Sequence, residues 1–195
     1  MDPLQEKEKI RFNIKKIRNT LTEREIKNRS NKIKNTIYNM TEFKIASTIL
    51  FYVSYGSEVY THDMIKECIL SEKKVVVPKT ILENEKLTLS ELLDWNHLEL
   101  GAYNILEPKD EYLKEIQINS IDLFLIPGVV FDLSGNRIGH SKGYYDKLLK
   151  KEHSVSYFGL AFEDQIVDKI PIESHDVMMD KIVTDKRVID CKKTR

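Results

Sequence analysis

The chain has 195 residues, with 31 Lys or Arg and 31 Asp or Glu, so its formal net charge is zero. This balance argues against a protein that binds nucleic acid or anionic lipid mainly through a strong general field. The length suits a single domain, which we expect to span residues 1–195. Two distant cysteines suggest neither a disulfide framework nor a zinc site. No apolar run resembles a signal peptide or a membrane span, and we expect a cytoplasmic monomer with no membrane partner.

Two amphipathic helices are predicted at the start of the chain. Apolar residues recur at helical spacing from Ile10 to Leu21. Thr22 and Glu25 then have the spacing of a capping box that opens a second helix. Basic residues outnumber acidic ones in positions 1–40, which suits either a solvated helix face or a surface that faces an anion.

The rest of the chain alternates strands and helices. Nearly continuous apolar runs predict buried strands at 45–53, 74–78, 121–126 and 154–162, and two short strands at 182–183 and 188–189. Helices are expected after Thr61 and over 144–151. Residues 79–120 offer only a short strand candidate at 87–89, and we expect them to be irregular. This order predicts an α/β fold with a largely parallel sheet and helices on both faces.

In such sheets ligands bind beyond the carboxyl ends of the strands, so the loops after Val53, Ile126 and Phe162 should carry the chemistry. The second of these loops is rich in glycine, with four of the chain's seven glycines between positions 128 and 143. Glycines let backbone N–H groups approach an anion, and a helix starting near residue 143 would direct its positive end the same way.

Charged residues flank this glycine loop. Arg137 and Lys142 could neutralise a phosphate, and Asp146 could hold the metal that accompanies a nucleotide. A plain turn with exposed cations explains the same residues equally well. The segment matches neither a Walker loop nor the G-x-G-x-x-G fingerprint, so its spacing alone leaves both interpretations open.

The run PGVVFDLSGNRIGHSKGYYDKLL resembles the signature of the 5-formyltetrahydrofolate cyclo-ligases, P-G-x-x-F-D-x-x-G-x-R-L-G-x-G-x-G-Y-Y-D. Weaker similarities extend over nearly the whole chain in the family's order, at residues 7–11, 57–61, 107–108, 165–166 and 171–176. The resemblance implies a single three-layer α/β/α domain. Ser141 departs from the pattern where a middle glycine is usual, which bears on the loop's geometry and its affinity for ATP, and Tyr60 replaces a frequent Asp.

The resemblance further implies an enzyme that uses ATP and Mg²⁺ to close 5-formyltetrahydrofolate into 5,10-methenyltetrahydrofolate, with release of ADP and phosphate. Its substrate would be a small molecule, with or without a polyglutamate tail, and it would have no nucleic-acid partner. By position, the resemblance assigns ATP binding to Lys7, Arg11, Arg137, Ile138, Gly139, His140, Ser141, Lys142, Gly143, Tyr144 and Tyr145. It assigns folate binding to Val53, Glu58, His140, Ser141, Lys142, Gly143 and Tyr144.

The same resemblance assigns Mg²⁺ to Asp146 and Asp176. The catalytic candidates are Lys142 and Arg137, as cations that stabilise developing charge, and Tyr144, close to the formyl group. These residues lie in the glycine loop or directly after it, apart from Asp176, which follows Asp146 by thirty positions.

Two other classes of protein remain open. An α/β enzyme that acts on a sugar phosphate could use a similar sheet, because a fold does not determine a function. Such an enzyme would not require ATP. A noncatalytic module could hold RNA through the basic N-terminal helices, and its binding would weaken steeply with salt. That interpretation leaves Gly139, Gly143 and Asp146 without a role.

Overall fold

The structure is a computed structural model that describes residues 2–140, 143–149, 155–174 and 176–191. Its centre is a seven-stranded sheet in the order β12-β11-β9-β6-β1-β2-β3. The four inner pairings are parallel and the two outer ones antiparallel, which confirms the predicted α/β class with a largely parallel sheet. The strands are β1 (Thr48–Leu50), β2 (Lys74–Ile81), β3 (Lys86–Glu91), β6 (Leu123–Ile126), β9 (Ser156–Leu160), β11 (Lys181–Val183) and β12 (Val188–Asp190).

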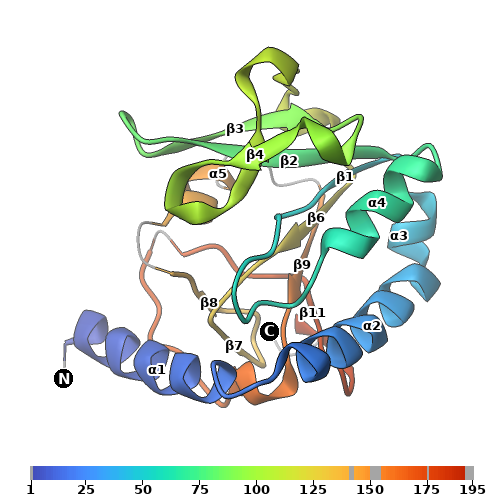
Figure 1. Cartoon of the computed structure of the whole chain (residues 1–195). Helices are drawn as coiled ribbons and strands as arrows, with labels where there is room; N and C mark the ends of the chain where they lie inside the picture. Colours follow the sequence, from blue (N-terminus) through green and yellow to red (C-terminus); the bar gives the residue numbers. More distant parts are fainter. Residues whose placement is uncertain (1, 141–142, 150–154, 175, 192–195) are drawn as a thin grey trace.

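Three helices cover one face of this sheet (Figure 1): α2 (Glu23–Asn39), α3 (Thr41–Ile45) and α4 (His62–Leu70). Successive strand residues point to opposite faces, so Ile49 packs towards these helices and Leu50 packs away from them. Helix α2 begins at the predicted capping box, in which Thr22 and Glu25 each accept the other's backbone N–H.

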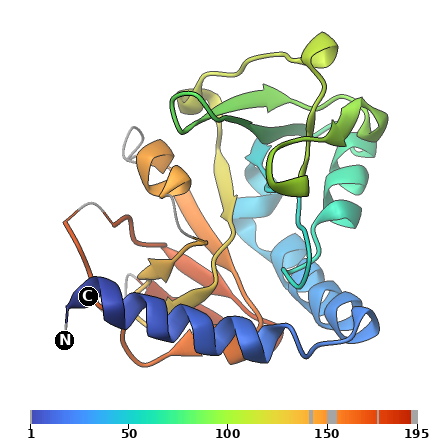
Figure 2. The ribbon, with the colours of Figure 1, turned by 60° about the vertical axis from the view of Figure 1, so that its left-hand side comes forward.

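The opposite face carries helix α5 (Tyr144–Leu149) and a small sheet of β10 (Ile166–Val167), β7 (Val130–Asp132) and β8 (Arg137–Ile138). Helix α1 (Pro3–Arg18) lies across this small sheet and packs Ile14 against it (Figure 2). The fold therefore has the three layers that the resemblance implied. In the part of the chain that the structure describes, no helix is both long and apolar enough to cross a membrane.

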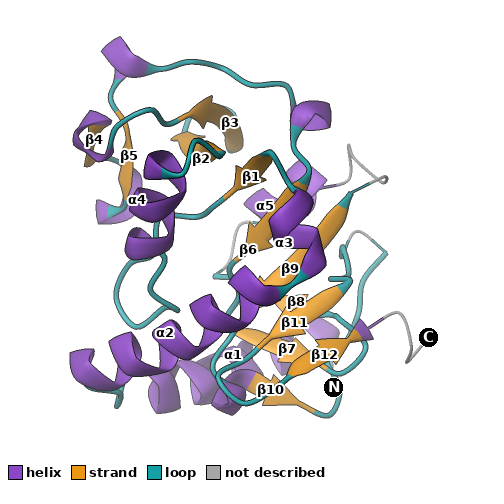
Figure 3. Ribbon diagram, turned by 90° about the vertical axis from the view of Figure 1, so that its right-hand side faces the viewer, coloured by secondary structure: helices purple, strands orange, loops and turns teal. Residues whose placement is uncertain are grey.

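The expectation that residues 79–120 are irregular is wrong. Strand β2 continues past Pro78 to Ile81 and forms an antiparallel hairpin with β3. Pro78 is tolerated because β2 pairs with β1 only over residues 74–76. Strands β4 (Leu98–Leu100) and β5 (Leu106–Pro108) form a second hairpin beside β2 (Figure 3). Short 3₁₀ helices lie at Trp95–His97, Ala102–Asn104, Asp110–Tyr112, Ile118–Ser120 and Glu163–Gln165.

The first strand is shorter than the apolar run that predicts it. The run covers residues 45–53, but Ile45 ends α3 and β1 contains only Thr48–Leu50. Residues 51–53 are buried without belonging to a strand. A continuous apolar run reports burial and does not by itself fix the backbone conformation.

Candidate active site

A cavity of about 470 Å³ lies beyond the carboxyl ends of β1 and β6. This volume is typical of sites for small molecules. Its walls come from α1, the segment after β1, the β2–β3 and β4–β5 hairpins, the loop that leads into α5, and the chain near residues 173–176. The loops expected after Val53 and Ile126 therefore both contribute to it. Glu173 and Asp176 come from the connection between β10 and β11, and not from the turn directly after Phe162.

All of the described site residues predicted from the sequence line this one cavity. They are Lys7, Arg11, Val53, Glu58, Arg137, Ile138, Gly139, His140, Gly143, Tyr144, Tyr145, Asp146 and Asp176. Ser141 and Lys142 lie outside the described residues. Their convergence is a property of the fold, whereas the role of each residue stays a prediction.

Gly143 and Gly128 shape the loop between β6 and α5. Gly143 has φ of +64°, a left-handed conformation that glycine adopts without a steric penalty, and α5 begins at the next residue. A Cβ at Gly128 would lie 2.4 Å from Cζ of Phe131 and 3.0 Å from Cγ of Arg137. Glycine is therefore required at both positions for this path of the chain.

Arg137 is buried in the cavity wall, with 3% of its side chain exposed. Its Nη2 donates to Oδ1 of Asp146 at 2.7 Å, and its Nη1 donates to the Pro127 carbonyl at 3.4 Å. Its Nε has no hydrogen-bond partner among the described residues. The interpretation of Arg137 as an exposed cation on a plain turn is therefore wrong. Arg137 is a buried guanidinium, and Asp146 compensates its charge.

Lys7 joins the first helix to the chain near residue 176. Its Nζ donates to Oε2 of Glu173 at 2.8 Å and to Oδ2 of Asp176 at 2.6 Å. Burial alone would lower the pKa of Lys7, but its hydrogen bonds to Asp176 and Glu173 hold the pKa above its ordinary value. The ammonium therefore stays charged inside the cavity wall.

Asp146 and Asp176 both line this cavity, as do Gly139 and Gly143, and their role as metal ligands stays a prediction. Their segments also touch, since the backbone N–H of Val177 donates to Oδ1 of Asp146 at 3.4 Å. Among the described residues no group of three or more His, Cys, Asp and Glu side chains has the arrangement of a metal cage. Two carboxylates fit Mg²⁺ when phosphate oxygens and water complete its coordination.

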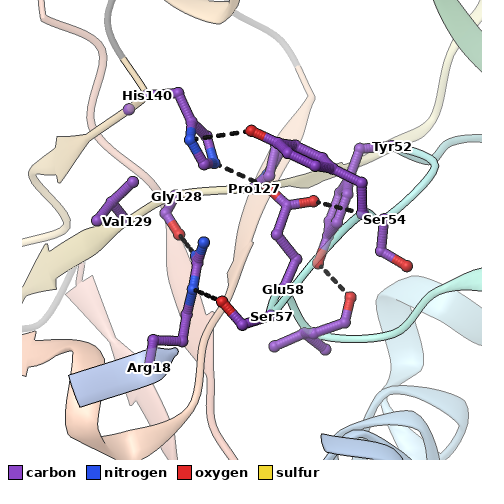
Figure 4. A network of polar contacts seen from close by, with 12 residues as sticks. Arg18, Tyr52, Ser54, Ser57, Glu58, Pro127, Gly128, Val129 and His140 are labelled. Carbon is purple, nitrogen blue, oxygen red and sulfur yellow. Dashed lines mark hydrogen bonds and ion pairs between the residues drawn. The ribbon is translucent and has the colours of Figure 1, made fainter. Parts of the chain in front are cut away.

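A second polar group, around Glu58, lies on the side of the cavity that follows β1 (Figure 4). Glu58 is 5% exposed, and its Oε1 lies 3.0 Å from Nε2 of His140. Its Oε2 accepts the backbone N–H of Tyr55 at 3.2 Å. The Tyr55 hydroxyl lies 3.1 Å from Nδ1 of His140. The glycine loop and the segment after β1 are thus joined through His140.

Hydrogen bonds from Arg18 and Tyr52 hold the segment after β1 that contains Glu58. Nε of Arg18 donates to Oγ of Ser57 at 3.0 Å, and its Nη1 donates to the Gly128 carbonyl at 3.4 Å. The Tyr52 hydroxyl donates to the Val59 carbonyl at 2.9 Å. The side chains of Arg18 and Tyr52 are both buried, so the turn that carries Glu58 is well packed.

The remaining predicted residues close the cavity. Nε of Arg11 donates to the Gly139 carbonyl at 2.9 Å, which ties α1 to the glycine loop. The Tyr144 hydroxyl lies 3.3 Å from that of Tyr103, between the start of α5 and the β4–β5 connection. Burial raises the pKa of Tyr145, so its hydroxyl stays protonated.

Several lining residues have no predicted role. Tyr55, Glu107 and Glu173 supply polar groups, and the two hairpins supply an apolar wall that includes Leu87 and Leu106. The Glu107 carboxylate accepts the backbone N–H of Thr80 at 3.1 Å and that of Ala102 at 3.4 Å. Only the Glu107–Pro108 pair gave a sequence signal here, as one of the weaker similarities.

Known proteins resemble this chain along most of its length. The model of the 5-formyltetrahydrofolate cyclo-ligase family matches residues 3–185. A 5-formyltetrahydrofolate cyclo-ligase of Haemophilus influenzae is 30% identical over 177 residues, covering 89% of this chain and 94% of that protein. One of Mus musculus is 28% identical over 152 residues, covering 73% of this chain and 75% of that protein.

Solved structures resemble the fold as a whole. The NMR structure of Aquifex aeolicus 5,10-methenyltetrahydrofolate synthetase has a TM-score of 0.85 at 30% identity, covering 97% of this chain and 94% of that one. A 5,10-methenyltetrahydrofolate synthetase from Mycoplasma pneumoniae has a TM-score of 0.74 at 24% identity, covering 95% and 99%, and shows the shared fold. With the family model matching almost the entire chain, the protein belongs to the 5-formyltetrahydrofolate cyclo-ligase family.

Proposed function

We propose that the protein uses ATP and Mg²⁺ to convert 5-formyltetrahydrofolate into 5,10-methenyltetrahydrofolate, with release of ADP and phosphate. The family acts on a small-molecule folate and is ATP-dependent. The observation that carries the proposal is that one cavity contains two chemically different groups of residues. Glu58 and His140 form one group, and the pairs Arg137–Asp146 and Lys7–Asp176 form the other.

The group around Glu58 suits the pterin end of a folate. A pterin ring presents N–H donors along one edge, and a buried carboxylate is a strong acceptor for them. Val53, from the same segment after β1, also lines the cavity, and Leu87 and Leu106 supply apolar surface from the hairpins. Such a pocket, mostly apolar with a few directed polar groups, is typical of cofactor-sized ligands.

The other group suits the phosphates of a nucleotide. Lys7 and Arg137 are buried cations that would bind phosphate oxygens, and Arg11 holds the glycine loop through Gly139. Mg²⁺ bound with the nucleotide would be held by Asp146 and Asp176 and would neutralise phosphate charge there. We assign Lys142 to the same phosphates by its position in the family signature.

The proposed reaction proceeds in two displacements. The formyl oxygen on N5 attacks the γ-phosphorus of ATP, and ADP leaves. N10 then attacks the activated formyl carbon, the phosphate departs with that oxygen, and N10 loses its proton. An amide-like oxygen leaves poorly until it is phosphorylated, which is why ATP is consumed. The protein's task is to align the formyl oxygen with the γ-phosphate and to stabilise the spreading charge, through Arg137 and Lys142 with Tyr144 near the formyl group.

One domain is sufficient for this chemistry, because both groups of residues belong to one cavity. We therefore propose that residues 1–195 form a single catalytic domain.

The test is the growth of methenyltetrahydrofolate absorbance when the purified protein is mixed with 5-formyltetrahydrofolate, ATP and Mg²⁺. We expect product only in the complete mixture, and none when ATP is omitted or when Mg²⁺ is chelated. Equal product without ATP would contradict the proposal. Absence of product in the complete mixture would also contradict it.

A further inference from the structure

We propose that Tyr55 is a positioning residue that holds Glu58 in its working orientation, through His140 and through its own backbone N–H. The proposal rests on the proposed function, in which Glu58 binds the pterin end of the folate. Tyr55 lines the cavity and contacts both His140 and Glu58, yet nothing in the sequence signature includes it.

The hydrogen-bond chain has a defined direction. A carboxylate only accepts hydrogen bonds, so the contact of 3.0 Å between Glu58 Oε1 and His140 Nε2 places a hydrogen on Nε2. In the neutral ring Nδ1 is then an acceptor, and the Tyr55 hydroxyl, 3.1 Å away, donates to it. The order is Tyr55 O–H to His140 Nδ1, and His140 Nε2–H to Glu58. The hydroxyl therefore stabilises, at Nδ1, the same tautomer that the contact with Glu58 requires at Nε2.

Burial supports this direction. The Tyr55 ring is half-buried, and burial raises the pKa of its phenol above the ordinary value. The nearby Glu58 carboxylate raises that pKa further, and Arg18 opposes the rise. The hydroxyl is thus protonated at neutral pH and available as a donor.

Tyr55 holds the second oxygen of the carboxylate by a different route. Its backbone N–H donates to Oε2 of Glu58 at 3.2 Å. Each carboxylate oxygen can accept more than one hydrogen bond, so both oxygens can still receive donors from a pterin. The carboxylate is therefore fixed at both oxygens before substrate arrives, which reduces the entropy lost on binding.

Glu58 lies in a part of the chain where the secondary structure does not hold its side chain in place. It follows the turn at Gly56, which has φ of +57°, in a segment with no regular secondary structure between β1 and α4. His140 comes from the other side of the cavity, in the loop that leads to α5. A tautomer fixed by Tyr55 thus ties the folate carboxylate to the glycine loop.

The substitution Tyr55→Phe tests the proposal, because it keeps the ring and the backbone N–H and removes only the hydroxyl. We expect the KM for 5-formyltetrahydrofolate to rise about three- to tenfold, the effect of one hydrogen bond, while kcat and the KM for ATP stay within about twofold of wild type. Tyr112→Phe is the matched control. Tyr112 stacks on His97 with ring centroids 3.8 Å apart, outside the cavity, and its change should leave all three parameters unchanged.

Two further measurements separate an effect through His140 from a general loss of packing. After His140→Ala, the additional change Tyr55→Phe should raise the folate KM no further, because the link is already broken. In the imidazole ¹⁵N spectrum, wild-type His140 should show the Nε2–H tautomer, and Tyr55→Phe should show a mixture of tautomers. A doubly protonated ring in the wild type, or an unchanged tautomer in the variant, overturns the proposal.

The kinetic outcomes distinguish a failure of the proposed function from a failure of the positioning role of Tyr55. A wild-type protein that forms no methenyltetrahydrofolate overturns the proposed function, and with it the folate role of Tyr55. A wild-type protein that is active, together with a Tyr55→Phe variant whose folate KM is unchanged, overturns the positioning role alone.

Discussion

Single residues in the cavity carry charges that are already paired with one another. Lys7 is held by Glu173 and Asp176, and Arg137 is held by Asp146. Removing one member of such a pair leaves a buried charge without compensation, which costs stability as well as binding. The clearest kinetic tests therefore use residues whose loss leaves no buried charge behind.

Lys142 is tested first; it lies outside the described residues, and its position in the family signature assigns it to the ATP phosphates. If it binds the ATP phosphates, Lys142→Ala should raise the KM for ATP by about tenfold or more, the effect of losing a charge-assisted hydrogen bond. The thermal midpoint should change little, since a loop cation seldom contributes much to folding. Lys147→Ala is the control, because that lysine is exposed and pairs with Glu85 away from the cavity. Unchanged ATP kinetics in Lys142→Ala would remove Lys142 from the site.

Glu58 is the second. Glu58→Gln keeps the shape of the side chain and removes its charge, so it should raise the KM for 5-formyltetrahydrofolate by roughly tenfold and the KM for ATP much less. Glu67→Gln offers a comparison, because Glu67 also accepts side-chain hydrogen bonds, from Lys34 and Tyr38, but lies outside the cavity. If steady-state kinetics of Glu58→Gln showed a change only in the KM for ATP, Glu58 would not bind the folate.

Between elements, Arg29 connects α2 to the far end of the sheet. Its Nε and Nη2 donate to the two Asp185 oxygens at 2.8 and 3.0 Å, just after β11, and its Nη1 contacts Asp164 at 2.5 Å. The Asp185 side chain is 6% exposed. Arg29→Ala leaves this carboxylate without its cation and should lower the free energy of unfolding by about 2–4 kcal/mol. Chemical denaturation checks this, with Arg24→Ala, an exposed arginine on the same helix, as the control. Equal losses in both variants would contradict the role of the pair.

The start of α4 gives a prediction about pH. Burial lowers the pKa of His62, whose Nε2 donates to the Ser54 carbonyl at 2.8 Å. The folded protein therefore binds the proton less readily than the unfolded chain, whose histidine has a pKa of about 6.5. The contribution of neutral His62 to the free energy of unfolding is therefore complete above about pH 6.5, and it is lost as the pH falls below this value. Unfolding free energies measured between pH 7 and 5 should fall for the wild type and less steeply for His62→Gln, and parallel slopes would contradict this.

Sequence patterns predict some elements much better than others. Helix α2 was predictable from its cap, and the inner parallel strands from their continuous apolar runs, because both signals are local. The hairpins of residues 79–120 were not, because β2 passes through Pro78 and β3 is only partly buried. Site residues within the signature were predictable for the same reason. Tyr55 and Glu173 were not, since no local pattern marks them and their side chains contact residues distant in the sequence, His140 and Lys7.

At the scale of the whole molecule, the cavity exists only when distant parts of the chain fold together. Lys7 of α1 contacts Asp176, and His140 contacts Glu58, across sequence separations of 169 and 82 residues. Helix α1 lies over the small sheet and so closes one side of the cavity (Figure 2). This closure brings the groups proposed for the folate and for the phosphates to one space, where a formyl oxygen and a γ-phosphate can be aligned.

In the proposed reaction ATP is cleaved to ADP and phosphate only as the ring closes in this cavity, and one measurement tests this coupling directly. ADP and methenyltetrahydrofolate are quantified in the same reaction over its time course, with 5-formyltetrahydrofolate as the limiting reagent. We expect one ADP for each methenyltetrahydrofolate formed, and no ADP beyond background when the folate is omitted. Methenyltetrahydrofolate formed without ADP, or ADP released at the same rate without folate, would contradict it.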